Sequence, residues 1–128
     1  MTLHKLTDYH DDTKLLDEIR ALLAPSYERY GHFGLKGITE PVPGMQHEMY
    51  TLRDDAGQLA AFYTVGYHDI TGIPCGYLGL SAVRDDCKGL GLAGRLYSAQ
   101  LADCRQREAQ AEYRILLYFT TATPLVFD

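Results

Sequence analysis

The sequence predicts an α+β (α/β-like) fold, a mixed β-sheet with helices on both of its faces. Two observations predict this fold. Strand-like segments at 47–53 and 59–67 flank a short turn, which indicates an antiparallel hairpin. A strand at 76–83, a helix at 91–109 and a strand at 114–120 then form a crossover unit, whose two strands are parallel if they are neighbours.

The composition indicates an ordinary globular protein. With 128 residues, a single domain spanning 1–128 is expected, because two domains would need unusually small cores. Hydrophobic residues make up 46% of the chain and charged residues 23%. No run approaches the roughly 20 apolar residues that span a bilayer, and the segment 1–12 lacks the apolar stretch of a secretory signal. We therefore expect a cytoplasmic protein that does not associate with membranes.

Charge and residue spacing argue against two classes of function. The net charge is −5, from 12 basic and 17 acidic residues. Because phosphate contacts require clustered Lys and Arg, and no basic block is present, we expect no nucleic-acid binding. The cysteines at 75, 87 and 104 match no CxxC spacing, and the histidines form no HxH or HExxH pattern. We therefore expect no metal site, and reduced thiols.

The first part of the chain predicts a short strand, a helix and a long loop. Residues 4–6 favour the strand, and Asp11–Thr13 supplies the cap of a helix that Pro25 ends. A further short helix is expected at 26–30. The segment 31–46 holds four glycines and two prolines, so it is a loop, which either binds a ligand or simply connects two elements.

The remaining elements follow in order. The turn at 54–57 contains a glycine that can adopt the positive φ of a hairpin turn. Thr71–Pro74 breaks the second hairpin strand, and a third strand covers 76–83. The strand at 114–120 is expected to be compact and buried. The apolar side chains of the helix at 91–109 are expected on one face: Ala93, Leu96, Tyr97, Leu101 and Cys104.

The segment that joins the 76–83 strand to the next helix carries the strongest functional pattern. Glycines at 89, 91 and 94 let the backbone approach a ligand closely, and the first helical N–H groups have no acceptor within the helix. The helix dipole and Lys88 add positive charge, so the segment is suited to a diphosphate. Its GxGxxG spacing also fits a dinucleotide fingerprint, but the expected acidic residue is absent at the end of the next strand.

Residues 83–96 resemble the cofactor-binding motif of the GCN5-related N-acetyltransferases (GNAT). In that motif an apolar strand ends in valine, and Arg/Gln-x-x-Gly-x-Gly/Ala follows after a short loop; Val83 and the segment 88–93 match this spacing. Two positions depart from it, with Asp85 in place of the usual proline and Lys88 in place of Arg or Gln. The order of strands and helices also matches. The resemblance therefore implies a fold of the acyl-CoA N-acyltransferase type that is short at its C-terminal end.

The resemblance implies acetyl-CoA as cosubstrate. In the family, the end of the strand offers main-chain groups to the pantetheine arm, the following loop wraps the pyrophosphate, and the thioester lies in the gap before the diverging next strand. Carried over position by position, the cofactor-binding residues are Ala82, Val83, Lys88, Gly89, Leu90, Gly91, Leu92, Ala93 and Gly94.

The implied activity is transfer of an acetyl group to a primary amine of a small molecule or peptide. The amine must lose a proton, so a base is needed. Some family members carry it on the strand that corresponds to 76–83, which here holds no Asp or Glu. Glu48, His68 and Tyr77 are the remaining candidates, although packing would also explain each of them. The acceptor wall of the family corresponds to four residues that would equally pack a short helix: Tyr27, Tyr30, His32 and Phe33.

The sequence departs from the family after residue 120. The family continues with a helix, which often begins with a cofactor-contacting asparagine, and with a later tyrosine acid; neither has a counterpart in 121–128. The chain is then a piece of a longer enzyme or is completed by another subunit. The alternative function is a non-catalytic or partial GNAT-fold module that binds CoA or a partner protein. Because 115–119 is a run of large apolar side chains, we expect a homodimer or higher oligomer through 113–128.

Overall fold

A computed structural model of the protein describes residues 1–24 and 38–119. Several predictions concern, wholly or in part, residues outside these ranges and stay predictions. They are the short helix at 26–30, the loop at 31–46, the self-association through 113–128, and the acceptor wall formed by Tyr27, Tyr30, His32 and Phe33.

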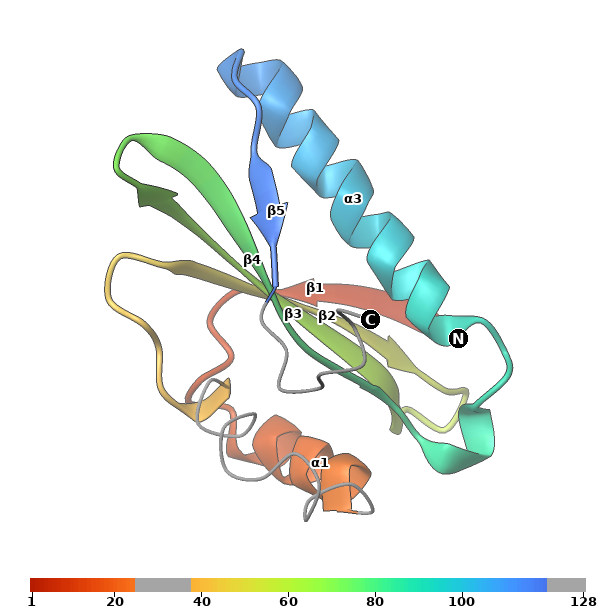
Figure 1. Cartoon of the computed structure of the whole chain (residues 1–128). Coiled ribbons are helices and arrows are strands. Elements are labelled where there is room, and N and C mark those ends of the chain that lie inside the picture. Colours follow the sequence, from red (N-terminus) through yellow and green to blue (C-terminus); the bar gives the residue numbers. More distant parts are fainter. Residues whose placement is uncertain (25–37, 120–128) are drawn as a thin grey trace, which may run out of the picture.

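The described residues form a five-stranded mixed sheet with the strand order β1-β2-β3-β4-β5 (Figure 1). Its strands are β1 (Thr2–Leu6), β2 (Gln46–Arg53), β3 (Leu59–Ile70), β4 (Ile73–Val83) and β5 (Leu116–Tyr118). Neighbouring strands are antiparallel from β1 to β4, whereas β4 and β5 are parallel. The predicted hairpin, crossover and mixed sheet are confirmed.

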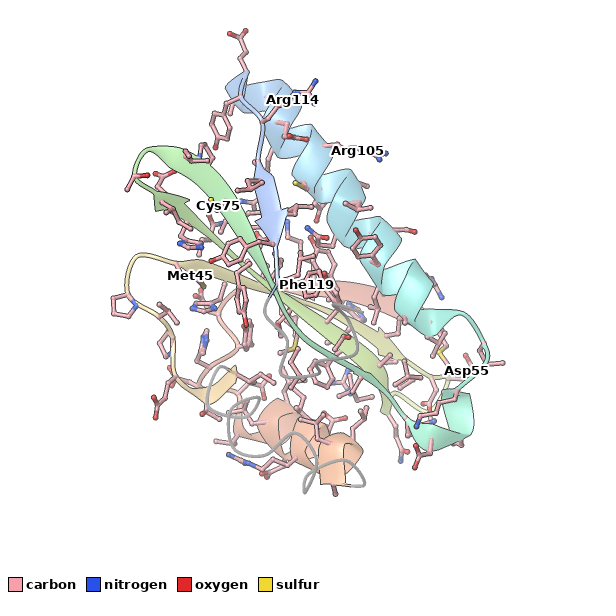
Figure 2. The ribbon with its side chains drawn as sticks, viewed as in Figure 1. Met45, Asp55, Cys75, Arg105, Arg114 and Phe119 are labelled. Atoms are coloured by element: carbon pink, nitrogen blue, oxygen red, sulfur yellow. The ribbon has the colours of Figure 1, made fainter. Side chains whose placement is uncertain are left out.

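Helices α1 (Thr13–Leu23) and α3 (Leu92–Ala111) cover opposite faces of this sheet (Figure 1). Because side chains alternate along a strand, the two faces bury two separate clusters. The cluster under α3 includes Tyr50, Tyr63 and Leu96, and the cluster under α1 includes Ile19 and Phe62. Side chains fill the space between the sheet and both helices (Figure 2). The predicted α+β class with helices on both faces is therefore confirmed.

Local sequence explains where most elements begin and end. Asp12 caps α1, since its Oδ1 accepts a hydrogen bond from the Leu15 N–H at 3.1 Å. The hairpin between β2 and β3 contains Gly57 at a φ of +79°. The predicted break after the second hairpin strand is present but shorter than 71–74, because only two residues leave the sheet there. Thr71 and Gly72 both adopt positive φ, as the tightest hairpin turns require, and β4 resumes directly after them.

Two further expectations need correction. The buried residues of α3 are Leu92, Leu96, Gln100 and Cys104, a row at four-residue spacing, whereas Tyr97 is 42% exposed. Gln100 is only partly compensated there: its Nε2 donates to the Tyr67 hydroxyl at 3.4 Å, whereas its buried Oε1 has no hydrogen-bond partner among the described residues. β5 is shorter than predicted and is not buried: Leu116 is 57% exposed, since β5 is the last strand of the described sheet.

Candidate active site

The glycine turn, residues 88–94, lies between β4 and α3 after a short 3₁₀ turn, η2 (Asp85–Cys87). Gly89 and Gly91 adopt φ values of +83° and +74°, a backbone conformation that side chains disfavour. A Cβ added at Gly89, Gly91 or Gly94 would meet no atom within 4 Å. The space in front of the turn is thus open, and the first N–H groups of α3 lack intrahelical acceptors. This geometry can accept an anion.

Lys88 lies in the turn but is paired with an acidic neighbour. Its Nζ is 2.7 Å from Asp85 Oδ1, and both side chains are 65% exposed. An exposed pair of this kind contributes at most about 1 kcal/mol. A phosphate group can therefore compete with Asp85 for the ammonium.

Arg84 connects the end of β4 to its surroundings and was not singled out by the sequence. Its guanidinium donates to Asp54 Oδ2 at 2.9 Å, to Asp86 Oδ1 at 2.6 Å and to the Leu59 carbonyl at 3.0 Å. The hydrogen bond from Arg84 lowers the pKa of the Asp86 carboxyl below its usual value. Arg84 therefore ties the β2–β3 turn, the start of β3 and η2 together, which fixes the chain as it enters the glycine turn.

One edge of β4 is open. β5 pairs with β4 only from Cys75 to Tyr77, and among the described residues no strand pairs with that edge from Leu78 to Val83. We call Leu78–Val83 the open edge. Its main-chain groups alternate in direction, so some of them point away from β3. The expected divergence of the two parallel strands is consistent with this short pairing.

A bulge interrupts the open edge. Ser81 pairs with Tyr63 and Leu78 with Val65, so two residues of β4 lie opposite Thr64 alone. The Thr64 hydroxyl accepts from the Leu80 N–H at 2.9 Å and donates to the Leu80 carbonyl at 3.3 Å. A Cβ on Gly79 would lie 2.2 Å from Thr64 Oγ1. Thr64 and a side-chain-free Gly79 therefore fix the bulge together.

His68 and Tyr77, two of the three catalytic candidates, lie close together, and a third residue joins them. The His68 Nε2 atom is 2.5 Å from the hydroxyl oxygen of Tyr118, and the Tyr118 ring centroid is 5.3 Å from that of Tyr77. These side chains come from β3, β4 and β5, at the point where β5 stops pairing with β4. Tyr118 was not among the residues predicted from the sequence. Its place beside Tyr77 becomes clear only from the parallel register of β4 and β5.

Glu48, the third candidate, faces α3 instead. It is 1% exposed, lies 3.5 Å from Lys5 Nζ and accepts a hydrogen bond from Arg107. The Arg107 guanidinium carbon also lies 4.1 Å from the centroid of the Tyr67 ring. Glu48 is thus part of an ion-pair cluster that joins β1, β2 and α3, and the structure does not bring it to His68 and Tyr77.

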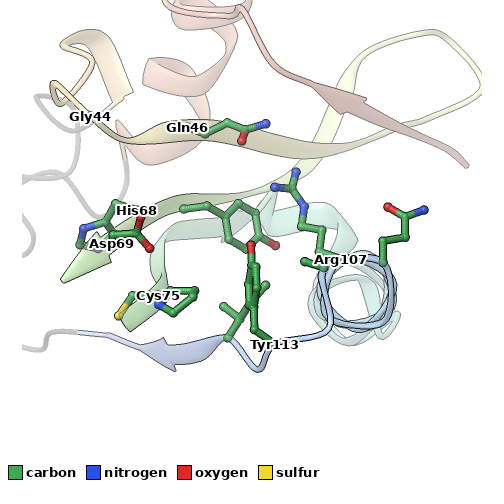
Figure 3. Close-up of a pocket in the computed structure, with 12 residues that line it drawn as sticks. Gly44, Gln46, His68, Asp69, Cys75, Arg107 and Tyr113 are labelled. Carbon is green, nitrogen blue, oxygen red and sulfur yellow. The ribbon is translucent and has the colours of Figure 1, made fainter. Parts of the chain in front are cut away.

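A pocket of about 500 Å³ opens at the end of β4 opposite the glycine turn (Figure 3). It lies between the β3–β4 hairpin, the last turns of α3 and the residues that lead into β5. Polar groups of Gln46, His68, Asp69 and Arg107 and the ring of Tyr113 line it. The pocket is therefore a polar hollow on the hairpin side of the sheet, close to the His68 position.

Within the ranges 1–24 and 38–119, no group of three His, Cys, Asp or Glu is placed to hold a metal ion. No helix in that part of the chain is long and apolar enough to cross a membrane.

Comparison with known proteins identifies the fold. No protein-family model matches the sequence, and no curated protein matches it. Solved structures do match. A ribosomal-protein-alanine N-acetyltransferase from Brucella melitensis biovar Abortus 2308 aligns with a TM-score of 0.60 at 21% identity, over 97% of this chain and 83% of that chain.

Two aminoglycoside acetyltransferases align in the same way. One, from an uncultured soil metagenomic sample and in complex with sisomicin, gives a TM-score of 0.63 at 10% identity, over 99% of this chain and 82% of that chain. The other, an aminoglycoside 6′-N-acetyltransferase complexed with coenzyme A, gives 0.60 at 17% identity, over 84% of this chain and 57% of that chain. Identities this low show the fold alone. The chain has the fold of the GCN5-related N-acetyltransferases, as the motif at 83–96 predicted.

Proposed function

We propose that this protein transfers an acetyl group from acetyl-CoA to a primary amine of a small molecule or peptide. The observation that carries the proposal is the continuity of the open edge of β4 with the glycine turn. Coenzyme A combines a diphosphate with an extended arm that contains two amides. The glycine turn suits the diphosphate, and the main-chain groups of Leu78–Val83 suit the arm, as an added strand would be bound.

The residues that we assign to coenzyme A are those of the strand end and the glycine turn. Main-chain groups do most of the binding, so what matters at these positions is the absence of bulk. Similarity to a structure complexed with coenzyme A supports the assignment. The residues are Ala82, Val83, Lys88, Gly89, Leu90, Gly91, Leu92, Ala93 and Gly94.

The acceptor is proposed at the level of its chemical class. A neutral amine attacks the thioester carbonyl, so the site must take up a proton and stabilise the oxyanion. The solved structures of this fold named above are described as enzymes for protein alanine and for aminoglycosides. Both acceptor types present primary amines, which supports the class without choosing between a peptide and a small molecule.

Calorimetry on Gly91→Glu tests coenzyme binding. A carboxylate at Gly91 fills the open space and repels a diphosphate, so we expect acetyl-CoA affinity to fall at least tenfold. Gly72→Glu is the matched control, because Gly72 also has a positive φ of +85° and open space but lies at the hairpin end of β4. Equal affinity of the Gly91 variant and the unchanged protein would remove the basis of the proposal.

Turnover separates the enzyme from the alternative module. Release of free thiol from acetyl-CoA is measured with simple alkyl amines, an aminoglycoside and a peptide that begins with alanine. Thiol release that depends on one of these amines supports the enzyme. Tight acetyl-CoA binding without release by any of them would favour the non-catalytic CoA-binding module.

We also propose that the protein self-associates through residues 113–128. In the described part of this segment, Leu116 and Phe119 are largely exposed, and β5 has no strand partner on its outer edge within the described ranges. Such an apolar edge favours pairing with another chain. Sedimentation at low and high salt should show a dimer or larger species in both, since an apolar contact is little screened. A monomer at tens of micromolar in both conditions would refute it.

A further inference from the structure

We infer that Tyr118 and His68 form a proton relay for the transfer reaction, with Tyr118 in contact with the reacting groups and His68 acting through it. The inference rests on the proposed function, because it needs acetyl-CoA on the open edge. It adds Tyr118 to the candidates and joins it to His68, which the sequence had already singled out.

The position of Tyr118 follows from the geometry of the open edge. From Val83 back to Leu78 the strand advances five residues, roughly 17 Å at about 3.3 Å per residue. An extended arm that starts at the glycine turn and follows this edge ends where β5 begins to pair. Tyr77 and Tyr118 form that last pair. The reactive end of the arm is therefore brought to the Tyr118 side of the sheet junction.

Three strands fix the relay in place. His68 on β3 lies opposite Cys75, and Tyr77 on β4 lies beside Tyr118 on β5. The His68 and Tyr118 rings are 5.7 Å apart between centroids, and their polar atoms are 2.5 Å apart. Both side chains are partly buried. A short contact between two side chains that the sheet holds in register costs little conformational entropy, which is what a proton path requires.

The relay uses one direction of this hydrogen bond. Burial, with smaller contributions from Cys75 and Tyr77, raises the pKa of Tyr118, so its hydroxyl keeps its proton at neutral pH. That hydroxyl donates to Nε2 of His68 in the tautomer that carries the imidazole hydrogen on Nδ1. In the arrangement that we propose, Tyr118 is therefore the donor and His68 the acceptor.

Tyr118 and His68 together can take up the proton of the amine and return it to the leaving sulfur. The amine nitrogen attacks the carbonyl carbon, a C–N bond forms, and the carbonyl electron pair moves to oxygen. The nitrogen, now positively charged, gives a proton to the Tyr118 oxygen as the original hydroxyl proton passes to His68 Nε2. When the carbonyl re-forms, the C–S bond breaks and sulfur leaves with the bonding pair. Sulfur takes a proton from Tyr118, which recovers one from His68, so both side chains return to their starting state.

A spectroscopic experiment tests the placement without needing the acceptor. In protein labelled with ¹⁵N-histidine, the His68 signals are assigned by their loss in His68→Gln. We expect saturating acetyl-CoA to shift the His68 Nε2 signal, because the thioester end reaches Tyr118. The nucleotide part of coenzyme A alone, adenosine 3′-phosphate 5′-diphosphate, should occupy the glycine turn and leave that signal in place. An unchanged His68 signal with acetyl-CoA bound would overturn the relay.

Kinetics test the chemistry with the amine that gives thiol release. Loss of a positioned acid or base typically costs on the order of 10²–10⁴ in rate. We expect Tyr118→Phe to lower kcat by such a factor while the calorimetric affinity for acetyl-CoA stays unchanged. The controls are Tyr97→Phe on the exposed surface of α3 and His4→Gln on β1, neither of which should change the rate. Thermal melting confirms that each variant is folded.

Imidazole rescue distinguishes proton transfer from simple packing at His68. His68→Ala should lose rate and regain part of it when free imidazole is added, because imidazole can occupy the vacated space and accept the Tyr118 proton. Tyr118→Phe should not respond to imidazole. Full activity of Tyr118→Phe, or no rescue of His68→Ala, would contradict the relay. Failure of the protein to bind acetyl-CoA at all would instead refute the proposed function, and the relay with it.

Discussion

The two ends of β4 present different kinds of chemical group. At the end that follows the open edge, one local stretch of chain passes through η2 and the glycine turn into α3, and the groups it presents are main-chain N–H groups. At the other end, His68, Tyr77 and Tyr118 come from three strands and present side-chain atoms. The proposed coenzyme binding at the first end depends on the absence of side chains at its glycines, whereas the proposed chemistry at the second end depends on single polar atoms.

This difference predicts how each end responds to substitution. Near the glycine turn, added bulk should reduce binding while leaving the fold intact, because the space there is open. At the sheet junction and the bulge, added bulk meets packed atoms. A Cβ on Gly76, for example, would lie 2.8 Å from a methyl carbon of Leu117. Four predictions sharpen this comparison.

The largest effect on stability is expected at the bulge. In Gly79→Ala the new methyl group overlaps Thr64 Oγ1, so the bulge must shift and its two hydrogen bonds with Leu80 weaken. Overpacking of this kind costs about 1–3 kcal/mol of unfolding free energy, measured by urea denaturation. Ser81→Ala, at an exposed position of the same strand, is the control. Because Thr64→Ala removes the overlapping atom, the double variant should lose less stability than the sum of the two single losses; simple additivity would contradict the overlap.

The second largest effect is expected at Arg84, where the chain leaves β4 and enters the glycine turn. Arg84→Met removes the guanidinium that joins Asp54, Asp86 and the Leu59 carbonyl. We expect a loss of about 1–2 kcal/mol in stability, since these charge-assisted bonds are partly exposed. Acetyl-CoA affinity should fall with it, because the entry to the turn is no longer fixed. Arg105→Met, farther along α3, controls for the loss of a surface arginine. An Arg84 variant with unchanged affinity would mean that the turn holds its shape unaided.

The features that the sequence predicted and those that it did not predict divide in a similar way, into local features and features that depend on strand register. The Asp12 cap, the turn at 54–57 and the glycine turn were predictable, because each depends on neighbours in sequence. The bulge at Thr64 and the pairing of Tyr118 with Tyr77 were not, because both depend on register between separate strands.

The burial errors have a physical cause as well. Hydrophobicity alone placed Tyr97 of α3 inside and left Gln100 out, whereas the packed row contains Gln100, whose Nε2 donates to the Tyr67 hydroxyl. Glu48 is buried for a comparable reason, since Lys5 and Arg107 compensate its charge. Hydrophobic periodicity therefore does not predict the burial of polar residues that have partners across the sheet.

The third effect has opposite signs in stability and binding. Gly94 lies in the first turn of α3 with open space in front of it. Alanine there should raise stability by about 0.5–1 kcal/mol, because glycine is a poor helix former. If a phosphate approaches this backbone, the same methyl group should weaken acetyl-CoA binding. Ser98→Ala, at an exposed position one turn later, should change stability slightly and affinity not at all. A Gly94 variant with gains in both quantities would place the diphosphate elsewhere.

The smallest effect is an acid response of two carboxyl groups near the glycine turn. Hydrogen bonds from the Gln58 N–H and from Arg84 lower the pKa of Asp54 below 3.8, and Arg84 lowers that of Asp86. A carboxyl whose pKa is lowered by folding stabilises the fold above its unfolded pKa, and this contribution is lost as pH falls through the folded pKa. Amide signals of Ala56 and Gln58, which donate to Asp54, should therefore titrate below pH 3.8, while those of Tyr77 should not. In Arg84→Met the Asp54 midpoint should rise toward its ordinary value. A midpoint that does not move would assign the lowered pKa to the backbone N–H groups alone.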